Sequence, residues 1–490
     1  MLALGATGCG PTCGDGVVED GEVCDGAPAP CETACGTAGS QACDPLSCQL
    51  GACVAPAESC DGVDQDCDGR TDEAFACAAG AIIECTTSCG STGHQRCDDA
   101  CTLGACEPPA ERCDNGVDDD CDGVIDRLGA LESFVVADEA SLSVPPALAA
   151  GPSEVAFVWA GLDGGYAMRR LGDPALGEDV LGPRRVLVPP AGDRVLPYGS
   201  AAAATGTGTV LAYEIQATWG QPGIWLQREG ALSTAPVVDN ALGFVSAPAI
   251  AVSGDAIGLA FLRLESSRRA AYFTVIGASG RGESHRISPG SAETHEPSVA
   301  ASAAGYGIAF SDDRHGPWRQ EGAVMLGNSE IYFARVDPDG APIGAEVRVS
   351  EAEGLSGAPS LVWNGSQFGL AWVDRRTGFG AIHFAVIDID GVIVAPDTRL
   401  AGGPDATQPS LSWSGEEWGV AWAAGPERRE QIFFARVAAS GARIGEPARI
   451  TTIPRERRAP RAVFRGSWFL TWAEPASSTA TIHAARVGCE

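Results

Sequence analysis

Apolar and polar residues alternate in short runs over most of the chain beyond residue 128, and these runs form a repeated unit. The unit occurs twice in succession between Pro359 and Thr451. It reads PSLVWNGSQFGLAWVDRR then AIHFAVIDIDG in the first copy, and PSLSWSGEEWGVAWAAG then QIFFARVAASG in the second. Alternation with a period of two, interrupted by Gly-containing turns, is typical of antiparallel strands joined by hairpins. Four short strands in about fifty residues is the size of one β-propeller blade.

The same unit can be traced seven times along the chain. A proline opens the predicted first strand of each unit: Pro146, Pro197, Pro248, Pro297, Pro359, Pro409 and Pro460. A large aromatic residue closes the predicted second strand: Trp159, Tyr213, Phe261, Phe310, Trp372, Trp422 and Trp472. The fourth unit is longer and carries an insertion over residues 312–330. We therefore predict an all-β fold, with a seven-bladed β-propeller over residues 129–490.

The ends of this repeated region predict how the ring closes. The last unit lacks a fourth strand, because only three residues follow its third strand, residues 482–487. A strand without a unit of its own, residues 132–137, precedes the first unit. Exposed sheet edges are costly, so we expect residues 132–137 to complete the seventh blade. That pairing brings Cys489 to the end of the preceding region, where Cys121 or Cys113 is its expected partner.

The composition changes near residue 128. Eighteen of the nineteen cysteines lie between Cys9 and Cys121, a density that persists as disulfides only in an oxidising compartment. Few large apolar residues accompany them, so disulfides rather than a core must hold this region together. The net charge of −31 disfavours nucleic acid and anionic membranes as partners. No apolar run is long enough to span a bilayer, so we predict an exported protein without a transmembrane segment.

The cysteine-rich region divides into a first segment, residues 9–30, and two copies of one pattern, residues 31–76 and 77–128. The intervals between the cysteines of one copy match those of the other to within one residue. The equivalent cysteines are Cys31, Cys35, Cys43, Cys48, Cys53, Cys60 and Cys67 in the first copy and Cys85, Cys89, Cys97, Cys101, Cys106, Cys113 and Cys121 in the second.

Each copy ends in an acidic motif, CDGVDQDCDGRTDE over residues 60–73 and CDNGVDDDCDGVID over residues 113–126. Carboxylates at alternate positions, followed by a glycine that permits a sharp turn, form the first half of an EF-hand-type loop. The bidentate Glu that ends such a loop is absent, so a further Asp must help to complete the oxygen shell. Cys60 with Cys67, and Cys113 with Cys121, are candidates to clamp the loops. The predicted metal ligands are Asp64, Asp66, Asp68 and Asp72 in the first copy and Asp118, Asp120, Asp122 and Asp126 in the second.

These two motifs resemble the MopE-type metal-binding repeat of secreted bacterial proteins. The resemblance implies a metal site, and that family has been linked with copper. The sequence itself supplies no soft or imidazole cluster, because the cysteines are expected to be oxidised and His94 stands alone. Oxygen ligands favour Ca²⁺, so we expect Ca²⁺ rather than copper. The alternative is an acidic, disulfide-closed turn that binds no specific ion.

The first residues, MLALGATGCG, resemble the end of a bacterial lipoprotein signal, in which small residues precede a lipidated cysteine. The charged part and most of the apolar part of such a signal are missing, which indicates a start assigned too late. The resemblance implies that residues 1–8 are a signal remnant and that Cys9 carries a lipid. It places the protein on the outer membrane or cell surface, or outside the cell. The alternative is an ordinary N-terminus with Cys9 in a disulfide.

Charged residues follow the second-strand aromatic residue of several units, and equivalent loops of a propeller share one face. The candidate ligand-binding residues are Asp313, Arg314, Asp374, Arg375 and Glu474. One interpretation is an acid/base or sugar-binding site like that of sialidase-type propellers, although the Ser-x-Asp-x-Gly-x-Thr-Trp box of that family does not occur. The other interpretation is a set of hydrated turns with local Asp–Arg pairs, and no catalytic residue is assigned.

Three functions fit these patterns. We favour an extracellular or cell-surface binding protein, in which a Ca²⁺-stabilised, disulfide-rich stalk presents a propeller head to a protein or glycan ligand. On this interpretation the protein is not an enzyme. The alternatives are a propeller glycoside hydrolase of the sialidase-like kind and a structural component of a surface layer. A propeller fold by itself does not decide between them.

Overall fold

The computed structural model describes residues 13–14, 18, 23–109, 111, 113, 117–123, 128–142, 144–151, 154–172, 181–188, 197–215, 221–231, 235–278, 280–316, 319–321, 324–326, 328–402, 405–453 and 455–489. All regular secondary structure in these ranges is β-strand, β1 to β36. The chain divides into two compact units. The N-terminal unit comprises residues 1–112 and 116–125, and the C-terminal unit comprises residues 113–115 and 126–490.

The N-terminal unit contains little regular structure and a core made of cystine. Its described part holds one three-stranded antiparallel sheet, β1 (Ala29–Glu32), β2 (Ala38–Cys43) and β3 (Leu50–Val54), and one hairpin, β4 (Ile82–Thr86) and β5 (Thr92–Arg96). Every buried apolar side chain described in this unit is a cysteine. The prediction of a disulfide-rich region without an ordinary core is confirmed. The disulfides are Cys13–Cys48, Cys24–Cys43, Cys31–Cys53, Cys35–Cys67, Cys60–Cys101, Cys77–Cys97, Cys85–Cys106 and Cys89–Cys121.

The predicted clamps across each acidic loop, Cys60 with Cys67 and Cys113 with Cys121, are wrong. Each loop is instead bonded to the hairpin turn that packs on it, so that Cys67 pairs with Cys35 and Cys121 with Cys89. The turn residue Thr37 donates through Oγ1 to the carbonyl of Gln65 at 2.8 Å, and Ser91 donates in the same way to Asp119 at 2.7 Å. These contacts bring the paired cysteines together.

The C-terminal unit consists of seven antiparallel sheets that follow one another along the chain. A separate hairpin, β22 (Arg319–Glu321) and β23 (Val324–Leu326), lies in the predicted insertion. The sheets are, in order, β7 (Ala147–Ala150), β8 (Val155–Ala160), β9 (Tyr166–Leu171) and β10 (Arg185–Val188); β11 (Pro197–Thr205), β12 (Gly208–Ile215), β13 (Gly223–Arg228) and β14 (Val238–Asp239); β15 (Val245–Ser253), β16 (Ala256–Glu265), β17 (Arg268–Gly277), β18 (Gly280–Arg281) and β19 (His285–Arg286); β20 (Thr294–Ser302), β21 (Gly305–Asp312), β24 (Glu330–Val336) and β25 (Pro342–Arg348); β26 (Ser356–Trp363), β27 (Gln367–Asp374), β28 (Ala381–Asp388) and β29 (Ile393–Gly402); β30 (Thr407–Trp413), β31 (Glu417–Ala424), β32 (Gln431–Ala438) and β33 (Arg443–Arg449); and β34 (Arg458–Phe464), β35 (Trp468–Pro475), β36 (Ala480–Cys489) and β6 (Leu128–Ala140).

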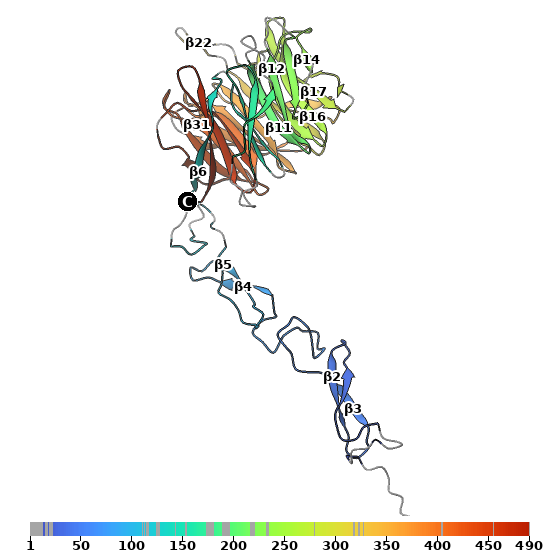
Figure 1. The fold of residues 1–490 in the computed structure, drawn as a ribbon. Helices are drawn as coiled ribbons and strands as arrows, with labels where there is room; N and C mark the ends of the chain where they lie inside the picture. The colour runs from blue at the N-terminus through green and yellow to red at the C-terminus, as the bar shows by residue number, and fades with distance from the viewer. Residues whose placement is uncertain are drawn as a thin grey trace, which may run out of the picture. The chain divides into compact units, whose positions relative to one another are not determined.

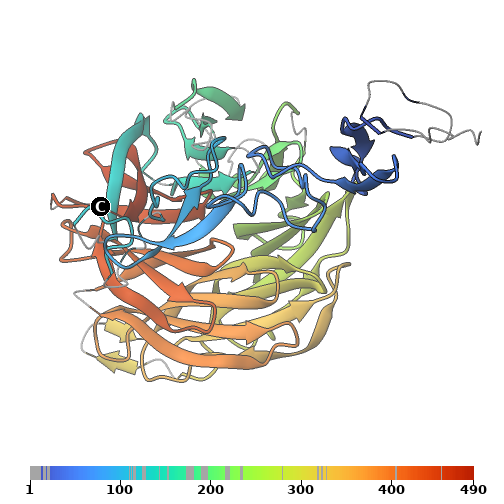
Figure 2. The ribbon, with the colours of Figure 1, turned by 90° about the horizontal axis from the view of Figure 1, so that it is seen from below.

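The first strands of the seven sheets contact one another in a cycle, from β7 through β11, β15, β20, β26, β30 and β34 back to β7. The sheets therefore follow one another around the unit in chain order, as the colours from teal through green and yellow to red show in Figure 2. One apolar cluster fills the space between each neighbouring pair of sheets. The core is thus divided into seven layers between the sheets.

A glycine in the second strand makes room for the aromatic residue of the next sheet. A Cβ atom on Gly369 of β27 would lie 2.8 Å from the ring of Trp418 on β31, and a Cβ on Gly419 would lie 2.5 Å from Trp468. Contacts this short do not occur, so a larger residue would force neighbouring sheets apart. The same relation recurs in the pairs Gly258–Tyr306 and Gly307–Phe368.

The strand that precedes the first sheet completes the last one, as predicted for residues 132–137. β6 pairs antiparallel with β36, with Val135 opposite His483, and it lies beside the C-terminal strands in Figure 1. The observed strand is longer than predicted. Cys489 at the end of β36 forms a disulfide with Cys113. The prediction of Cys121 as its partner is therefore wrong. Cys121 is already bonded to Cys89.

The prediction that a proline opens each first strand is wrong for five sheets, in which the proline lies inside the strand. The pairing register shifts at this proline, which marks a β-bulge. Proline has no N–H to donate, and a bulge is a place where a strand tolerates it. The residue before each of these prolines has a positive φ: Ala247, Glu296, Ala358, Gln408 and Ala459.

Candidate functional site

The first acidic loop of the N-terminal unit gathers three of its four predicted ligands. Asp64, Asp66 and Asp68 place carboxylate oxygens within 4.8 Å of one another. Backbone N–H groups hold the carboxylates in place, since Asp64 Oδ2 accepts from Gly69 at 2.9 Å. Gly69 has a φ of 90°, which other residues rarely adopt, so this glycine permits the turn that the motif requires.

Asp72, the fourth predicted ligand, is placed elsewhere. Its carboxylate is buried and accepts from the backbone N–H groups of Gly62 at 3.2 Å and Ala79 at 2.8 Å. A carboxylate with these donors fixes the fold of the loop instead of facing Asp64. Two other acids, Glu58 and Glu73, form a group with Asp66. The sequence reasoning missed both, although Glu58 has an equivalent in the second copy.

That equivalent is Glu111, which forms a group with Asp118 and Asp120 in the second loop. Asp118 Oδ2 accepts from Gly123 at 3.0 Å, as in the first loop. Its Oδ1 atom is buried and has no hydrogen-bond partner among the described residues. A buried carboxylate oxygen without a donor is costly unless a cation meets it. Asp122 is not part of this group, and Asp126 lies outside the described residues. Oxygen ligands of this kind fit a hard cation.

In the C-terminal unit, four of the five candidate ligand-binding residues form local ion pairs. Arg314 bonds to Asp312 at 2.8 Å and lies 3.9 Å above the ring of Tyr332. Asp374 is bonded by Arg376 at 2.6 Å, whereas Arg375 reaches Asp405 at 2.5 Å and Glu474 is bonded by Arg457 at 2.8 Å. These side chains do not converge on one pocket.

The Asp374 carboxylate belongs to a group with His383 and Asp397 that has the spacing of a metal site. Burial acts against ionisation of Asp374, but the hydrogen bonds from Arg376 outweigh it and hold the pKa of this carboxyl below its usual value. Arg376 also bonds to Asp397, and His383 donates to the same carboxylate. The guanidinium thus occupies the place that a cation would take, and the group fits an ion-pair network rather than a metal.

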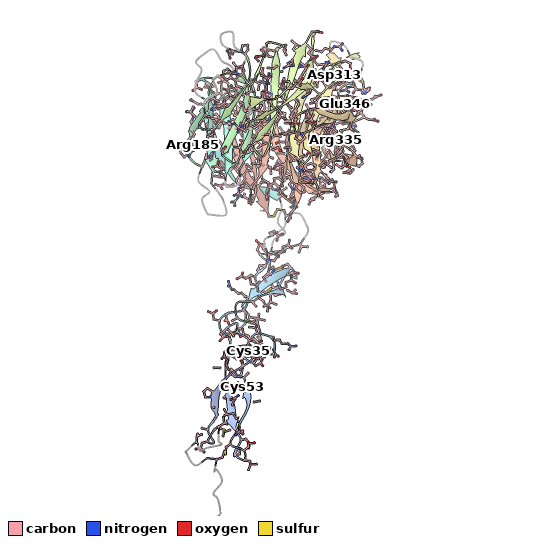
Figure 3. The ribbon with its side chains drawn as sticks, turned by 90° about the vertical axis from the view of Figure 1, so that its right-hand side faces the viewer. Cys35, Cys53, Arg185, Asp313, Arg335 and Glu346 are labelled. Atoms are coloured by element: carbon pink, nitrogen blue, oxygen red, sulfur yellow. A yellow bond between two sulfur atoms is a disulfide. The ribbon has the colours of Figure 1, made fainter. Side chains whose placement is uncertain are left out.

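Asp313, the fifth candidate and one of the residues labelled in Figure 3, contacts a histidine that the sequence reasoning did not select. Its Oδ2 lies 3.4 Å from Nε2 of His295 on β20. The other ring nitrogen of His295 lies 3.3 Å from Nη2 of Arg269, which Glu293 holds in place. Because Arg269 donates, Nδ1 of His295 accepts, and Nε2 then carries the proton that Asp313 accepts. The imidazole is therefore held between a cation and an anion.

Arg269 also lines a central cavity of about 670 Å³. All seven sheets contribute to its wall through their first strands or the residues beside them, and the charged residues that line it are Glu214, Arg269, Glu296 and Arg461. Burial lowers the pKa of the Arg461 guanidinium, which donates to the carbonyl of Pro460 at 3.0 Å. The cavity thus carries two cations, with a histidine that can exchange a proton beside one of them.

Both carboxylates of the cavity also support the ring of first strands. Glu214 Oε2 accepts from the N–H of Ala247 at 3.2 Å, and Glu296 Oε2 accepts from the N–H of Ala358 at 2.6 Å. Each bond runs from one sheet to the bulge of the next. These two glutamates therefore have a structural task. Arg269 and Arg461 are the cavity groups best placed to act on a ligand, and His295 contacts Arg269.

Two stretches of the chain, residues 55–73 and 109–127, match the family model of the Cu-binding MopE metal-binding motif. They contain both acidic loops and the glutamates Glu58 and Glu111. No curated protein matches the chain. Among the described residues, no helix is long and apolar enough to cross a membrane.

Several solved structures resemble the chain at low sequence identity. An ulvan lyase of polysaccharide lyase family PL25, bound to -[GlcA(1-4)Rha3S]-, aligns with 9% identity and a TM-score of 0.50, over 73% of this chain and 96% of the lyase. The polysaccharide lyase Uly1 aligns with 12% identity and a TM-score of 0.46, over 73% of this chain and 99% of its own. An α-L-arabinofuranosidase from Fusarium graminearum, in complex with an iminosugar inhibitor, has 12% identity and a TM-score of 0.41, over 73% and 98%.

These comparisons correct the functional prediction. The favoured interpretation, a surface binding protein that is not an enzyme, is contradicted, because an ulvan lyase is among the solved structures that resemble the chain. At 9% identity the likeness establishes the fold and no individual residue. The chain therefore joins two copies of the MopE-type metal-binding motif to an all-β unit with the fold of a polysaccharide lyase.

Proposed function

We propose that the C-terminal unit is a seven-bladed β-propeller that cleaves the glycosidic bonds of a polysaccharide in its central cavity. The cycle of first-strand contacts and the completion of the last sheet by β6 support a closed ring of seven blades. The likeness to the ulvan lyase supports a polysaccharide as the substrate. The observation that carries the proposal is Arg269, which lines the cavity and contacts His295, which in turn contacts Asp313.

This group fits β-elimination from an anionic sugar. A base removes the proton on the carbon next to the sugar carboxylate, the electron pair forms a C=C bond as the glycosidic C–O bond breaks, and the departing oxygen takes a proton. The substrate carboxylate attracts Arg269, which frees Nδ1 of His295 to accept the proton. Asp313 then holds the imidazolium through Nε2, and the cations stabilise the charge on the carboxylate.

Hydrolysis is the second candidate, because Glu214 and Glu296 line the same cavity and paired carboxylates are the usual catalysts of glycoside hydrolysis. The two reactions leave different products. The purified full-length protein should shorten polygalacturonate, measured by size-exclusion chromatography. β-Elimination adds the ultraviolet absorbance of an unsaturated uronic acid, whereas hydrolysis yields reducing ends without it. The proposal is rejected if the protein shortens none of these polymers: polygalacturonate, other uronate polysaccharides and neutral arabinan.

The N-terminal unit binds Ca²⁺ in this proposal, through Asp64, Asp66 and Asp68 in the first loop and the group around Asp118 in the second. The all-oxygen ligand sets and the match to a metal-binding motif support it. Copper prefers imidazole or sulfur ligands, and the described cysteines are bonded in disulfides. The nine disulfides also support export to an oxidising compartment, with Cys9 as the site of a lipid anchor.

A further inference from the structure

The sixth sheet, β30 to β33, carries a second hollow of about 410 Å³ outside the central cavity. It opens between this sheet and Ala401 on β29 of the preceding sheet. Trp422 and Phe433 form its apolar floor, with their rings stacked at 5.8 Å between centroids. Three arginines lie around the floor, and one of them, Arg443, is paired with Glu446, which also lines the hollow. We call this hollow the arginine pocket and define it by Trp422, Phe433, Arg429, Arg443 and Arg449.

The repeat shows what is unusual about this pocket. In the fourth sheet, Tyr332 stands opposite Arg348 in the same register in which Phe433 stands opposite Arg449. There, Glu330 at the start of β24 accepts from Nη2 of Arg348 at 2.8 Å. The equivalent residue at the start of β32 is Gln431. Arg449 has therefore lost the carboxylate that its counterpart uses.

Gln431 does not replace that partner. Its Nε2 donates to the carbonyl of Ile453 at 3.1 Å, and its Oε1 accepts from Oγ1 of Thr451 at 3.0 Å and from Arg457 at 3.4 Å. The amide is thus engaged with the segment that connects β33 to β34. Gln431 therefore does not bond to Arg449, whose side chain is exposed to solvent.

A second acid is also missing from this sheet. The position two residues after the second-strand aromatic residue holds Asp312, Asp374 and Glu474 in the fourth, fifth and seventh sheets, and each of them binds an arginine. In the sixth sheet this position is Ala424, which lines the pocket. In the described part of the chain, neither Arg429 nor Arg449 forms an ion pair. Two guanidinium groups are therefore available beside an aromatic floor.

We infer that the arginine pocket binds an anionic sugar unit of the polysaccharide substrate, separately from the central cavity. A guanidinium group pairs with a carboxylate or sulfate through two parallel hydrogen bonds, and the apolar face of a sugar ring packs on an aromatic floor. The chain carries a net charge of −31, so an anionic glycan approaches it only where positive charge is concentrated. The inference takes the class of ligand from the proposed function and adds a second contact along the same chain, which raises the apparent affinity.

Calorimetric titration with a galacturonic acid tetramer tests this inference on the full-length protein. All samples carry His295→Gln, so that the saccharide is not cleaved during the titration. Arg449→Gln should weaken one of two binding events about tenfold, the effect of losing a charge-assisted hydrogen-bond pair. Ala424→Asp with Gln431→Glu should weaken the same event, because the two new carboxylates bind the arginines internally. The matched control is Arg399→Gln, an exposed arginine in the equivalent register of the fifth sheet, which should change nothing.

Unchanged binding in the Arg449→Gln protein, or equal loss in the Arg399→Gln control, overturns the inference. So does equal binding of the tetramer methyl ester, which has the same rings without the charge. A sulfated oligosaccharide in place of the tetramer identifies which anion the pocket prefers. If the tetramer binds here while protein with His295 intact cleaves no polysaccharide, the proposed function fails and the arginine pocket stands. If the protein cleaves polysaccharide but this second binding event is absent, the proposed function stands and the inference about the arginine pocket fails.

Discussion

Cys113 and Cys489 are joined by a disulfide that bridges 376 residues of sequence and brings their Cα atoms to 5.1 Å. Cys113 precedes β6, and Cys489 ends the strand to which β6 is paired. The covalent bond and the strand pairing therefore close the cycle of sheets at the same place. A cross-link over so long a stretch restricts the unfolded chain strongly.

Replacement of both cysteines, Cys113→Ser with Cys489→Ser, should lower the free energy of unfolding of the C-terminal unit by roughly 2–4 kcal/mol. All eleven tryptophans lie in this unit, so their fluorescence during denaturant unfolding reports on it alone. The control, Cys77→Ser with Cys97→Ser, removes a disulfide of the other unit and should leave this transition in place. An unchanged midpoint in the first variant would mean that strand pairing alone closes the ring.

His483 stacks on Trp472 with an angle of 8° between the rings, and burial lowers the pKa of its imidazole. The carboxylate of Glu474 opposes this shift, while Arg457 and Arg455 reinforce it. Because the folded pKa lies below the ordinary value of 6.5, the unfolded state takes up the proton first. The contribution of His483 to the free energy of unfolding is therefore fully present above pH 6.5. It is lost as the pH falls from 6.5 to the lower pKa of the folded state.

The variant His483→Phe should reduce this loss, because phenylalanine stands at the equivalent place in the sixth sheet, as Phe433. The measurement is the melting temperature at pH 7.5 and at pH 5.5, with the difference expected to be smaller in the variant. His94→Gln, an exposed residue of the N-terminal unit, serves as the control. A difference as large as that of the wild-type protein would show that another group causes the acid sensitivity.

Calorimetry should detect saturable binding of about two Ca²⁺ ions, one for each acidic loop. Asp66→Ala with Asp120→Ala should abolish it, because each residue belongs to the acidic group of its loop. The control, Glu32→Ala with Glu84→Ala, removes the same charge from exposed strand positions and should bind as the wild-type protein does. Equal heats of Ca²⁺ binding from the loop variant and the control would show that the acidic surface attracts Ca²⁺ without specific sites in the loops.

Mass spectrometry of the membrane fraction of the source organism should find an acylated peptide that begins at Cys9. Every other cysteine of the chain is paired in a disulfide, which leaves Cys9 for another role. Cys9→Ser should release the protein from the membrane fraction while its disulfides still form. An unmodified peptide that includes residues before Cys9 would exclude the anchor.

The sequence predicted the regular parts of the fold well, since a repeated pattern of alternation and turns determines strands and their order. It also predicted the pairing of residues 132–137, because an incomplete sheet needs a fourth strand. It misplaced the prolines. A bulge at positive φ before Pro248 or Pro359 depends on the packing of first strands around the cavity, and no local propensity reports it.

The candidate site was predictable only in part, for the same reason. Asp313 was selected, but its partner His295 lies on β20 and comes close only when the second strand returns beside the first. Asp374 and Glu474 have the right chemistry but are bound by Arg376 and Arg457. Which acid is bound locally and which faces a cavity depends on side-chain contacts that spacing alone does not specify.

The most direct test of the proposed function follows the products of polygalacturonate incubated with the purified full-length protein. The wild-type protein should generate the ultraviolet absorbance of unsaturated uronic acid at the rate at which the polymer shortens. His295→Gln should lower that rate by a factor of roughly 10²–10⁴, the usual effect of losing a general base. His285→Gln, which alters a histidine on the short edge strand β19, should leave the rate unchanged. Shortening at an equal rate in the His295→Gln protein, or no shortening of any polysaccharide by the wild-type protein, would contradict the account.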